Sequence, residues 1–223
     1  MDLAAVRGRI AAAAVRAGRR PEDVTIVAVT KGHPLERVRE AAAAGLADVG
    51  ESRVQEALAK QAAWPAAPVR WHLIGHLQRN KAKLAVGRFA LIHSVDSVRL
   101  VEALESAAAA ADVVQEVLVE VNVAREPQKS GASPEEAAEL VAHAGRLTHL
   151  RVRGLMALAP FGAPLDVQHR VFGELRELRD SLATSSLELA VLSMGMSDDF
   201  EAAVAEGATM VRLGTILFGE RAS

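Results

Sequence analysis

The sequence contains no cysteine and no tyrosine, and aromatic residues make up only 3% of its 223 residues. Without cysteine, the chain has neither a disulfide framework nor a thiolate metal site. Without tyrosine, every mechanism that needs this residue as an acid or base is excluded. These absences narrow the range of enzyme chemistry before any motif is considered.

Neither charge sign is in large excess, because the sequence has 26 Lys and Arg residues and 28 Asp and Glu residues, for a formal net charge of −2. Both signs are scattered along the chain, so a nucleic-acid partner has no electrostatic footprint. Residues 1–20 lack the apolar core of a signal peptide, and no apolar run is long enough to span a membrane. We therefore expect a cytoplasmic protein without a membrane partner.

Strand-like and helix-like segments alternate along the whole chain. Short apolar runs predict strands at 24–30, 47–50, 71–74, 91–94, 117–123, 152–155, 189–192 and 210–213. Helical spacing of apolar residues predicts helices from residue 3 to about 18 and at 35–44, 52–62, 98–110, 134–144, 168–182 and 199–205. Ser133, Pro134 and Glu136 form a capping-box motif, and Ser197 is expected to cap the last of these helices.

Eight strand–helix units without a Gly/Ser/Pro-rich linker predict an α/β fold: a closed (β/α)₈ barrel of the TIM type. The first helix is extra to this repeat, and the barrel forms one domain over residues 1–223. An open doubly wound sheet would normally carry a glycine-rich phosphate loop after its first strand. The segment 30–33, Thr-Lys-Gly-His, stands there instead, which favours the barrel.

Functional residues of such a barrel gather where strands end, and Lys31 follows the first strand. Partial desolvation at the barrel mouth would lower the pKa of this lysine and free its amine for Schiff-base chemistry. A single lysine at a strand end is more often a surface residue, so its significance depends on its neighbours.

The loops after the seventh and eighth strands are rich in small residues, and barrels commonly bind phosphate there. Gly214 and Thr215 are expected to bind the anion through backbone N–H groups and a hydroxyl, with Ser193 and Gly195 completing the cradle. Taken alone, both segments also fit ordinary turns.

Arg212 lies on the eighth strand, which adjoins the first in a closed barrel. Pointing inward, it would share the mouth with Lys31 and stabilise an acceptor such as an unprotonated pyridine nitrogen or a phosphate oxygen. Pointing outward, it would pair with a carboxylate of a helix. The spacing leaves both orientations open.

Two histidines of the third strand do not form a metal site, because His72 and His76 would lie roughly 13 Å apart on an extended chain. We expect His72 to be a hydrogen-bonded core residue and His76 to reach the site. Met156 and Asn122 are candidates to line the mouth, although methionine at such a position more often fills a core.

Six ordered motifs resemble one known family. They are 28–31 (Ala-Val-Thr-Lys), 50–56 (Gly-Glu-Ser-Arg-Val-Gln-Glu), 71–81 (Trp-His-Leu-Ile-Gly-His-Leu-Gln-Arg-Asn-Lys), 154–156 (Gly-Leu-Met), 192–197 (Leu-Ser-Met-Gly-Met-Ser) and 211–215 (Val-Arg-Leu-Gly-Thr), followed by Phe218-Gly219. In these segments the chain resembles the pyridoxal phosphate homeostasis proteins, the YggS/PROSC family. The resemblance runs from the first strand to the last residues.

The resemblance implies a fold type III barrel, similar to the N-terminal domain of alanine racemase, with pyridoxal 5′-phosphate (PLP) bound to Lys31. It also implies that the family's lysine is Lys31, that its phosphate-binding segments are Ser193 and Gly214-Thr215, and that its strand-eight arginine is Arg212. Together with the residues at the strand ends, the expected cofactor-binding residues are Lys31, Ser52, His76, Met156, Ser193, Met194, Gly195, Arg212, Gly214 and Thr215. Ser52 stands where the family usually has asparagine, and a shorter side chain there implies a contact through water.

Members of this family are thought to buffer or deliver PLP, so the resemblance implies PLP homeostasis without catalysis, with PLP-dependent apoenzymes as partners. We expect a monomer, since no heptad or exposed apolar helix requires a dimer. The alternatives are a PLP-dependent racemase or decarboxylase using Lys31 as a base, and a Schiff-base aldolase acting on sugar phosphates. The missing tyrosine argues against a two-base racemase.

Overall fold

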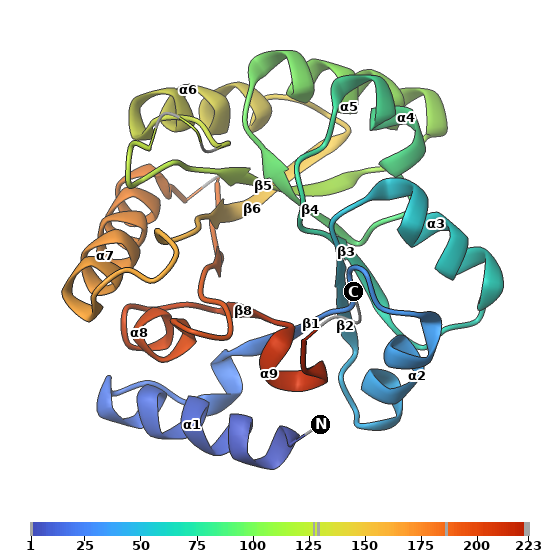
Figure 1. Cartoon of the computed structure of the whole chain (residues 1–223). Coiled ribbons are helices and arrows are strands. Elements are labelled where there is room, and N and C mark those ends of the chain that lie inside the picture. The colour runs from blue at the N-terminus through green and yellow to red at the C-terminus, as the bar shows by residue number, and fades with distance from the viewer. Residues whose placement is uncertain (1, 127, 129, 186, 221–223) are drawn as a thin grey trace.

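Eight parallel strands close into a barrel in chain order in the computed structural model, which describes residues 2–126, 128, 130–185 and 187–220 (Figure 1). The strands are β1 (Thr25–Val29), β2 (Asp48–Glu51), β3 (Arg70–Leu73), β4 (Leu91–Val95), β5 (Gln115–Glu120), β6 (Leu150–Met156), β7 (Val191–Ser193) and β8 (Met210–Leu213). The predicted (β/α)₈ barrel is confirmed, because β8 pairs with β1 and closes the sheet.

Helices surround this barrel as an outer ring (Figure 1). The α-helices are α1 (Leu3–Arg16), α2 (Leu35–Ala43), α3 (Val54–Ala63), α4 (Ala82–Ala85), α5 (Val98–Ala111), α6 (Pro134–Ala144), α7 (Leu165–Leu182), α8 (Phe200–Ala205) and α9 (Thr215–Phe218). Two 3₁₀ turns, Pro21–Asp23 and Arg79–Lys81, complete the set. Within the described ranges, no helix combines the length and the apolar character needed to cross a membrane.

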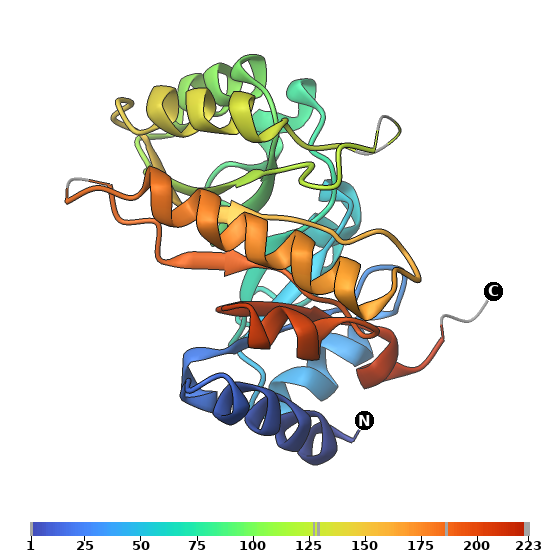
Figure 2. The ribbon, with the colours of Figure 1, turned by 90° about the vertical axis from the view of Figure 1, so that its left-hand side faces the viewer.

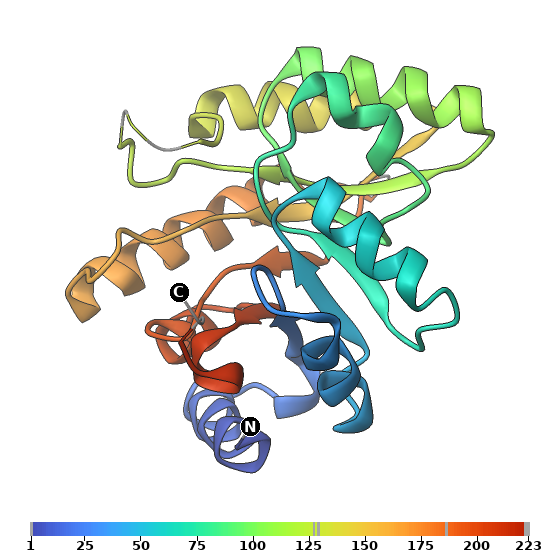
Figure 3. The same ribbon diagram turned by 45° about the vertical axis from the view of Figure 1, so that its right-hand side comes forward.

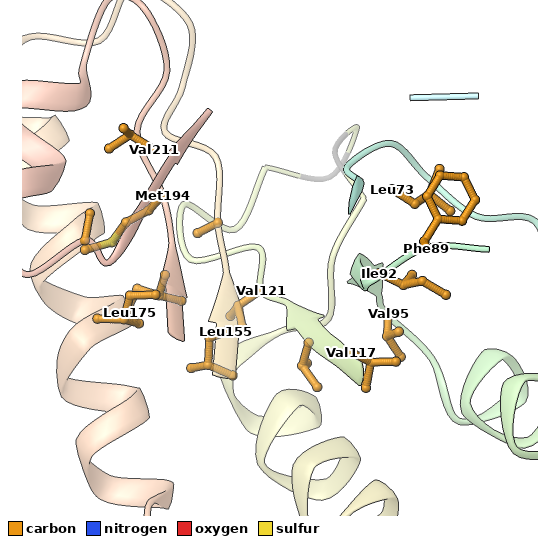
Figure 4. Close-up of a cluster of buried hydrophobic side chains, with 14 of the residues drawn as sticks. Leu73, Phe89, Ile92, Val95, Val117, Val121, Leu155, Leu175, Met194 and Val211 are labelled. Atoms are coloured by element: carbon orange, nitrogen blue, oxygen red, sulfur yellow. The ribbon is translucent and has the colours of Figure 1, made fainter. Parts of the chain in front are cut away.

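Burial on both faces explains why the strands are nearly continuous apolar runs. The main core lies between the strand wall and the helices, and Figure 4 shows part of it, including Met194, Leu175 and Val117. A smaller cluster of Leu91, Leu118 and Met156 forms a second apolar core. Polar strand residues that lie outside these two apolar cores are therefore candidates for the site.

The N-terminal helix packs beside the last elements of the chain. In Figure 2, α1, α8 and α7 lie side by side, and both neighbouring pairs are in contact. Figure 3 shows the red β8–α9 segment next to blue α1 and β1. The extra helix expected from the sequence therefore covers the place where the barrel closes.

Local sequence signals locate some helix ends and miss others. Ser133 caps α6 with a full capping box, as predicted. The prediction that Ser197 caps the following helix is wrong, because α8 begins after Asp199. The hydroxyl of Ser197 instead accepts a hydrogen bond, 3.2 Å long, from the backbone N–H of Ile216 in α9. Helices α4 and α9 were not predicted, since four residues show no periodicity.

Candidate functional site

Lys31 follows β1 in a turn whose backbone is held by helix α3. On one side of it, the carbonyl of Thr30 accepts a hydrogen bond from Nζ of Lys60 at 2.9 Å. On the other side, the N–H of Gly32 donates to Oε1 of Glu56 at 2.7 Å. Since both neighbours of Lys31 are bound, its backbone is fixed while its half-buried side chain extends from the turn.

An ionic cluster surrounds Lys60 behind this turn, and we call Thr30, Glu51, Glu56 and Lys60 the outer cluster. Oε1 of Glu51 lies 2.6 Å from Nζ of Lys60 and accepts a second hydrogen bond, also 2.6 Å long, from the hydroxyl of Thr30. The other oxygen of Glu51 is buried without a hydrogen-bond partner. Burial raises the pKa of Glu51, and the contacts with Lys60 and Thr30 offset this only in part.

Arg212 is buried and donates three hydrogen bonds inside the barrel. Its NH1 group reaches the carbonyl of Ser193 at 2.6 Å and the hydroxyl of the same residue at 2.7 Å. Its NH2 group donates to the carbonyl of Ala157 at 2.9 Å. Burial lowers the pKa of Arg212 to about 10, and the nearby charges of Asp199 and Glu120 act against that shift. Of the two orientations left open by the sequence, the structure has the inward one.

A line of hydrogen-bonded side chains continues from Arg212 through the protein. The Ser193 hydroxyl lies 2.9 Å from Nδ1 of His93, and Nε2 of His93 lies 2.9 Å from Nδ1 of His72. Nε2 of His72 in turn lies 2.8 Å from Oδ1 of Asp48. We call Asp48, His72, His93 and Ser193 the inner chain. The prediction that His72 is a hydrogen-bonded core residue is confirmed.

The loops after β7 and β8 meet near the end of β1. A Cβ atom at Gly214 would lie 3.4 Å from Cβ of Val29, two residues before Lys31. The ring of His33 lies 5.7 Å from that of Phe218 in α9. The turn that carries Lys31 and the loop that carries Thr215 therefore lie side by side.

A cavity of about 450 Å³ adjoins these loops. It is lined by Arg9, Ser197, Asp198, Thr215 and Ile216. The hydroxyls of Ser197 and Thr215 and the guanidinium of Arg9 provide donors for an anion, whereas Asp198 opposes one.

Two other loop residues have structural tasks. Gly195 has φ +92°, and a Cβ atom there would lie 2.6 Å from Cβ of Ala203, so only glycine fits this turn. Ser193, placed by the sequence in the phosphate cradle, is fully buried with its hydroxyl bonded to His93 and Arg212. Ser193 therefore contacts the site through Arg212.

The remaining predicted site residues lie at different depths. Ser52 follows β2 and is half-buried, with its backbone against Gly75. His76 is exposed, and its Nδ1 lies 3.3 Å from Asp96. Met156 and Met194 are buried in the two apolar cores. The side chains of these two methionines pack against apolar neighbours.

Sequence reasoning missed several residues that shape this site: Asp48, Glu51, Glu56, Lys60, His93 and Ser197. The i,i+4 spacing of Glu56 and Lys60 in α3 was a readable signal for an ion pair. Nothing in the spacing showed that Lys60 is buried. No group of three or more metal-binding side chains occurs in the part of the chain that the structure describes.

The fold and this arrangement define a class of protein, the alanine racemase N-terminal-domain barrels, whose family model matches residues 1–222. A pyridoxal phosphate homeostasis protein of Pseudomonas aeruginosa is 46% identical over 220 residues, which cover 99% of this chain and 94% of the relative. PipY of Synechococcus elongatus has been solved without PLP (40% identity, TM-score 0.85, covering 96% of this chain and 99% of PipY) and with PLP bound (39% identity, TM-score 0.83, covering 96% and 100%).

In each comparison, the similarity extends over nearly the full length of both proteins. The chain belongs to the pyridoxal phosphate homeostasis protein family. The family resemblance seen in the sequence motifs is thereby confirmed.

Proposed function

We propose that this protein binds PLP through a Schiff base on Lys31 and takes part in PLP homeostasis. The observation that supports this most strongly is the PLP-bound PipY structure, to which the chain is 39% identical with a TM-score of 0.83. The arrangement around Lys31 fits such a cofactor, because the backbone beside Lys31 is held by hydrogen bonds, the buried Arg212 lies on the strand that pairs with β1, and the loops after β7 and β8 line a cavity with hydroxyl donors.

Lys31 would hold the cofactor covalently. Its unprotonated Nζ adds to the aldehyde carbon, a C=N bond forms, and the carbonyl oxygen leaves as water. The outer cluster keeps the backbone of Lys31 in place through Thr30 and Gly32. We therefore assign the outer cluster the task of aiming the amine.

The phosphate would bind between the loops after β7 and β8. We assign it to Gly214 and Thr215, with the hydroxyl of Ser197 in the role that the sequence suggested for Ser193. Two of the five N–H donors of a guanidinium are left without a protein acceptor at Arg212 among the described residues, and we assign one of them to the ring nitrogen. Ser52 and His76 remain candidate rim contacts.

We further propose that binding is not followed by efficient turnover. The relatives are named homeostasis proteins rather than enzymes, and the chain has no tyrosine to act as a second acid or base. PLP-dependent apoenzymes are the partners we propose, with the protein acting in the cytoplasm as a monomer and a single domain. A racemase or decarboxylase remains the alternative, and detectable racemisation of an added amino acid would favour it.

Borohydride reduction followed by peptide mass analysis tests the covalent bond. Reduction converts an imine to a stable amine, so we expect the PLP mass on the peptide that contains Lys31 and on none of the other four lysines. Lys31→Ala should abolish the label and the yellow colour, whereas Lys83→Ala, on exposed α4, serves as the matched control.

The same experiment separates the competing proposals. Labelling spread over several lysines, or retained in Lys31→Ala, would refute the assignment. Colourless protein that instead forms a reducible adduct with a keto-sugar phosphate would favour an aldolase.

A further inference from the structure

The inner chain connects Arg212 with the opposite end of the barrel. Asp48 and His72 line a cavity of about 190 Å³ whose other lining residues include Arg70, Leu91, Val191 and Met210, the first residues of β3, β4, β7 and β8. From there, the hydrogen bonds pass through His93 and Ser193 to the guanidinium. His93 and Ser193 are both fully buried, so the link between the two ends excludes solvent.

The groups at the two ends of the inner chain, the Arg212 guanidinium and the Asp48 carboxylate, determine which atom donates each hydrogen bond between them. A guanidinium only donates, so the Ser193 oxygen accepts from Arg212. At the other end, burial raises the pKa of Asp48, but hydrogen bonds from His72 and Arg70 outweigh it and keep the carboxyl ionised. Because a carboxylate only accepts, Nε2 of His72 must carry a proton.

The donors and acceptors in the middle of the inner chain, at His93, then have one consistent arrangement. Burial is the main cause that moves the pKa of His93 well below its ordinary value, and the charge of Arg212 acts in the same direction, so this ring is neutral. Nε2–H of His93 donates to the bare Nδ1 of His72, and the Ser193 hydroxyl donates to the bare Nδ1 of His93. All hydrogen bonds therefore run in one direction, from Arg212 towards Asp48.

The reverse arrangement leaves a donor unused. If His72 carried protons on both nitrogens, Nδ1–H of His93 would donate to the Ser193 oxygen, which already accepts from Arg212. The serine proton would then have no acceptor among its bonded partners in the described structure. A buried hydroxyl in that position costs free energy, so the first arrangement is favoured.

We propose that Asp48, His72 and His93 are positioning residues for Arg212, acting through the Ser193 hydroxyl. This inference rests on the proposed function in so far as Arg212 faces the cofactor. The inner chain keeps the serine lone pairs turned to NH1, so the plane of the guanidinium is fixed by three oxygens. Its two remaining N–H donors then point in a constant direction.

The tautomers can be tested in the protein without cofactor. Nitrogen NMR of the labelled imidazole rings should find both His72 and His93 neutral and protonated at Nε2. Finding His93 protonated at Nδ1, or His72 as an imidazolium at neutral pH, would overturn the proposed direction of the chain. Because no ligand is present, this outcome is independent of the proposed function.

A matched pair of variants tests the effect on Arg212 in the PLP-loaded protein. Glutamine can accept from Ser193 and donate to His72, whereas phenylalanine can do neither. We therefore expect His93→Phe and Ser193→Ala to shift the visible absorbance maximum in the same direction, the double variant to shift it no further, and His93→Gln to retain the wild-type maximum. Gln115→Met controls for the loss of a buried polar group elsewhere.

The possible results distinguish a failure of the proposed function from a failure of the positioning role. If the wild type retains no PLP, the proposed function fails and the tautomer experiment alone decides on the inner chain. If it retains PLP but His93→Phe and Ser193→Ala leave the spectrum unchanged, the positioning role is wrong. Equal shifts in His93→Phe, His93→Gln and Gln115→Met would likewise refute it, because they would reflect general loosening.

Discussion

The outer cluster and the inner chain are two buried polar networks built on the same strand. Strand β2 supplies a carboxylate to each: Asp48 to the inner chain and Glu51, three residues later, to the outer cluster. An odd separation places two strand residues on opposite faces of the sheet. The outer cluster is ionic and branched and binds backbone, whereas the inner chain is linear and ends on a guanidinium.

This difference shows how one barrel wall can hold two polar groups in different ways. The outer cluster fixes the main chain around Lys31, and the inner chain is proposed to fix the side chain of Arg212. The two carboxylates also respond to burial differently. The pKa of Asp48 is lowered despite burial, because His72 and Arg70 donate hydrogen bonds to it, whereas burial prevails at Glu51 and raises its pKa.

Removing the cation of the outer cluster should have the largest effect. Lys60→Met leaves Glu51 and Glu56 without their ammonium partner, and breaking a buried ion pair costs about 3–5 kcal/mol. Urea unfolding measures this loss. Adding Glu51→Gln should restore part of the stability, since the uncompensated charge is removed, and Lys83→Met is the surface control. A loss below 1 kcal/mol, roughly that of a surface pair, would show that solvent reaches the outer cluster.

Breaking the inner chain should cost less. Ser193→Ala removes one acceptor from Arg212, but the guanidinium keeps the carbonyls of Ser193 and Ala157. We expect a loss of about 1–3 kcal/mol in the free energy of unfolding, largely because Nδ1 of His93 loses its donor. A loss as large as that of Lys60→Met would contradict the distinction drawn between the two networks.

The smallest expected effect is a difference in pH dependence. Asp48, with a lowered pKa, stabilises the fold fully above its ordinary value of 3.8, and this contribution is lost as the pH falls below it. Glu51, with a raised pKa, has the opposite sign: its ionisation destabilises the fold as the pH rises above 4.5.

Urea unfolding of two variants from acid to neutral pH checks these signs. The deficit of Asp48→Asn relative to wild type should grow as the pH rises. The stability of Glu51→Gln relative to wild type should instead improve over the same range. Parallel profiles for the two variants would remove this contrast between the networks.

The fold was predictable because its signals are local. All eight strands appear where short apolar runs predicted them, and α6 matches its predicted limits, 134–144, because a capping box and a proline mark its start. The start of α8 was not predictable. There, the Ser197 hydroxyl bonds Ile216, 19 residues further along the chain, and that contact exists only after the barrel closes.

The sequence predicted which elements carry the candidate site, but not which of its side chains are buried. Strand order alone brings Lys31 and Arg212 to neighbouring strands, as the register of Val27 with Arg212 shows. Whether Ser193 presents its hydroxyl to the rim or to the interior depends on where the three-residue strand β7 ends. His93 could not be recognised, because a single histidine in an apolar strand gives no sign of partners on two other strands.

The first helix, which lies outside the repeating pattern, has a further consequence. Arg9 pairs with Glu201 of α8 at 2.8 Å, and Arg19 donates to the carbonyls of Val204 and Ala208. Since Arg9 also lines the cavity beside Ser197 and Thr215, the helix reaches the end of the barrel where the loops after β7 and β8 lie, while Arg19 ties it to the segment before β8. Under the proposed function, a substitution at Arg9 would thus act on the phosphate-binding end of the barrel.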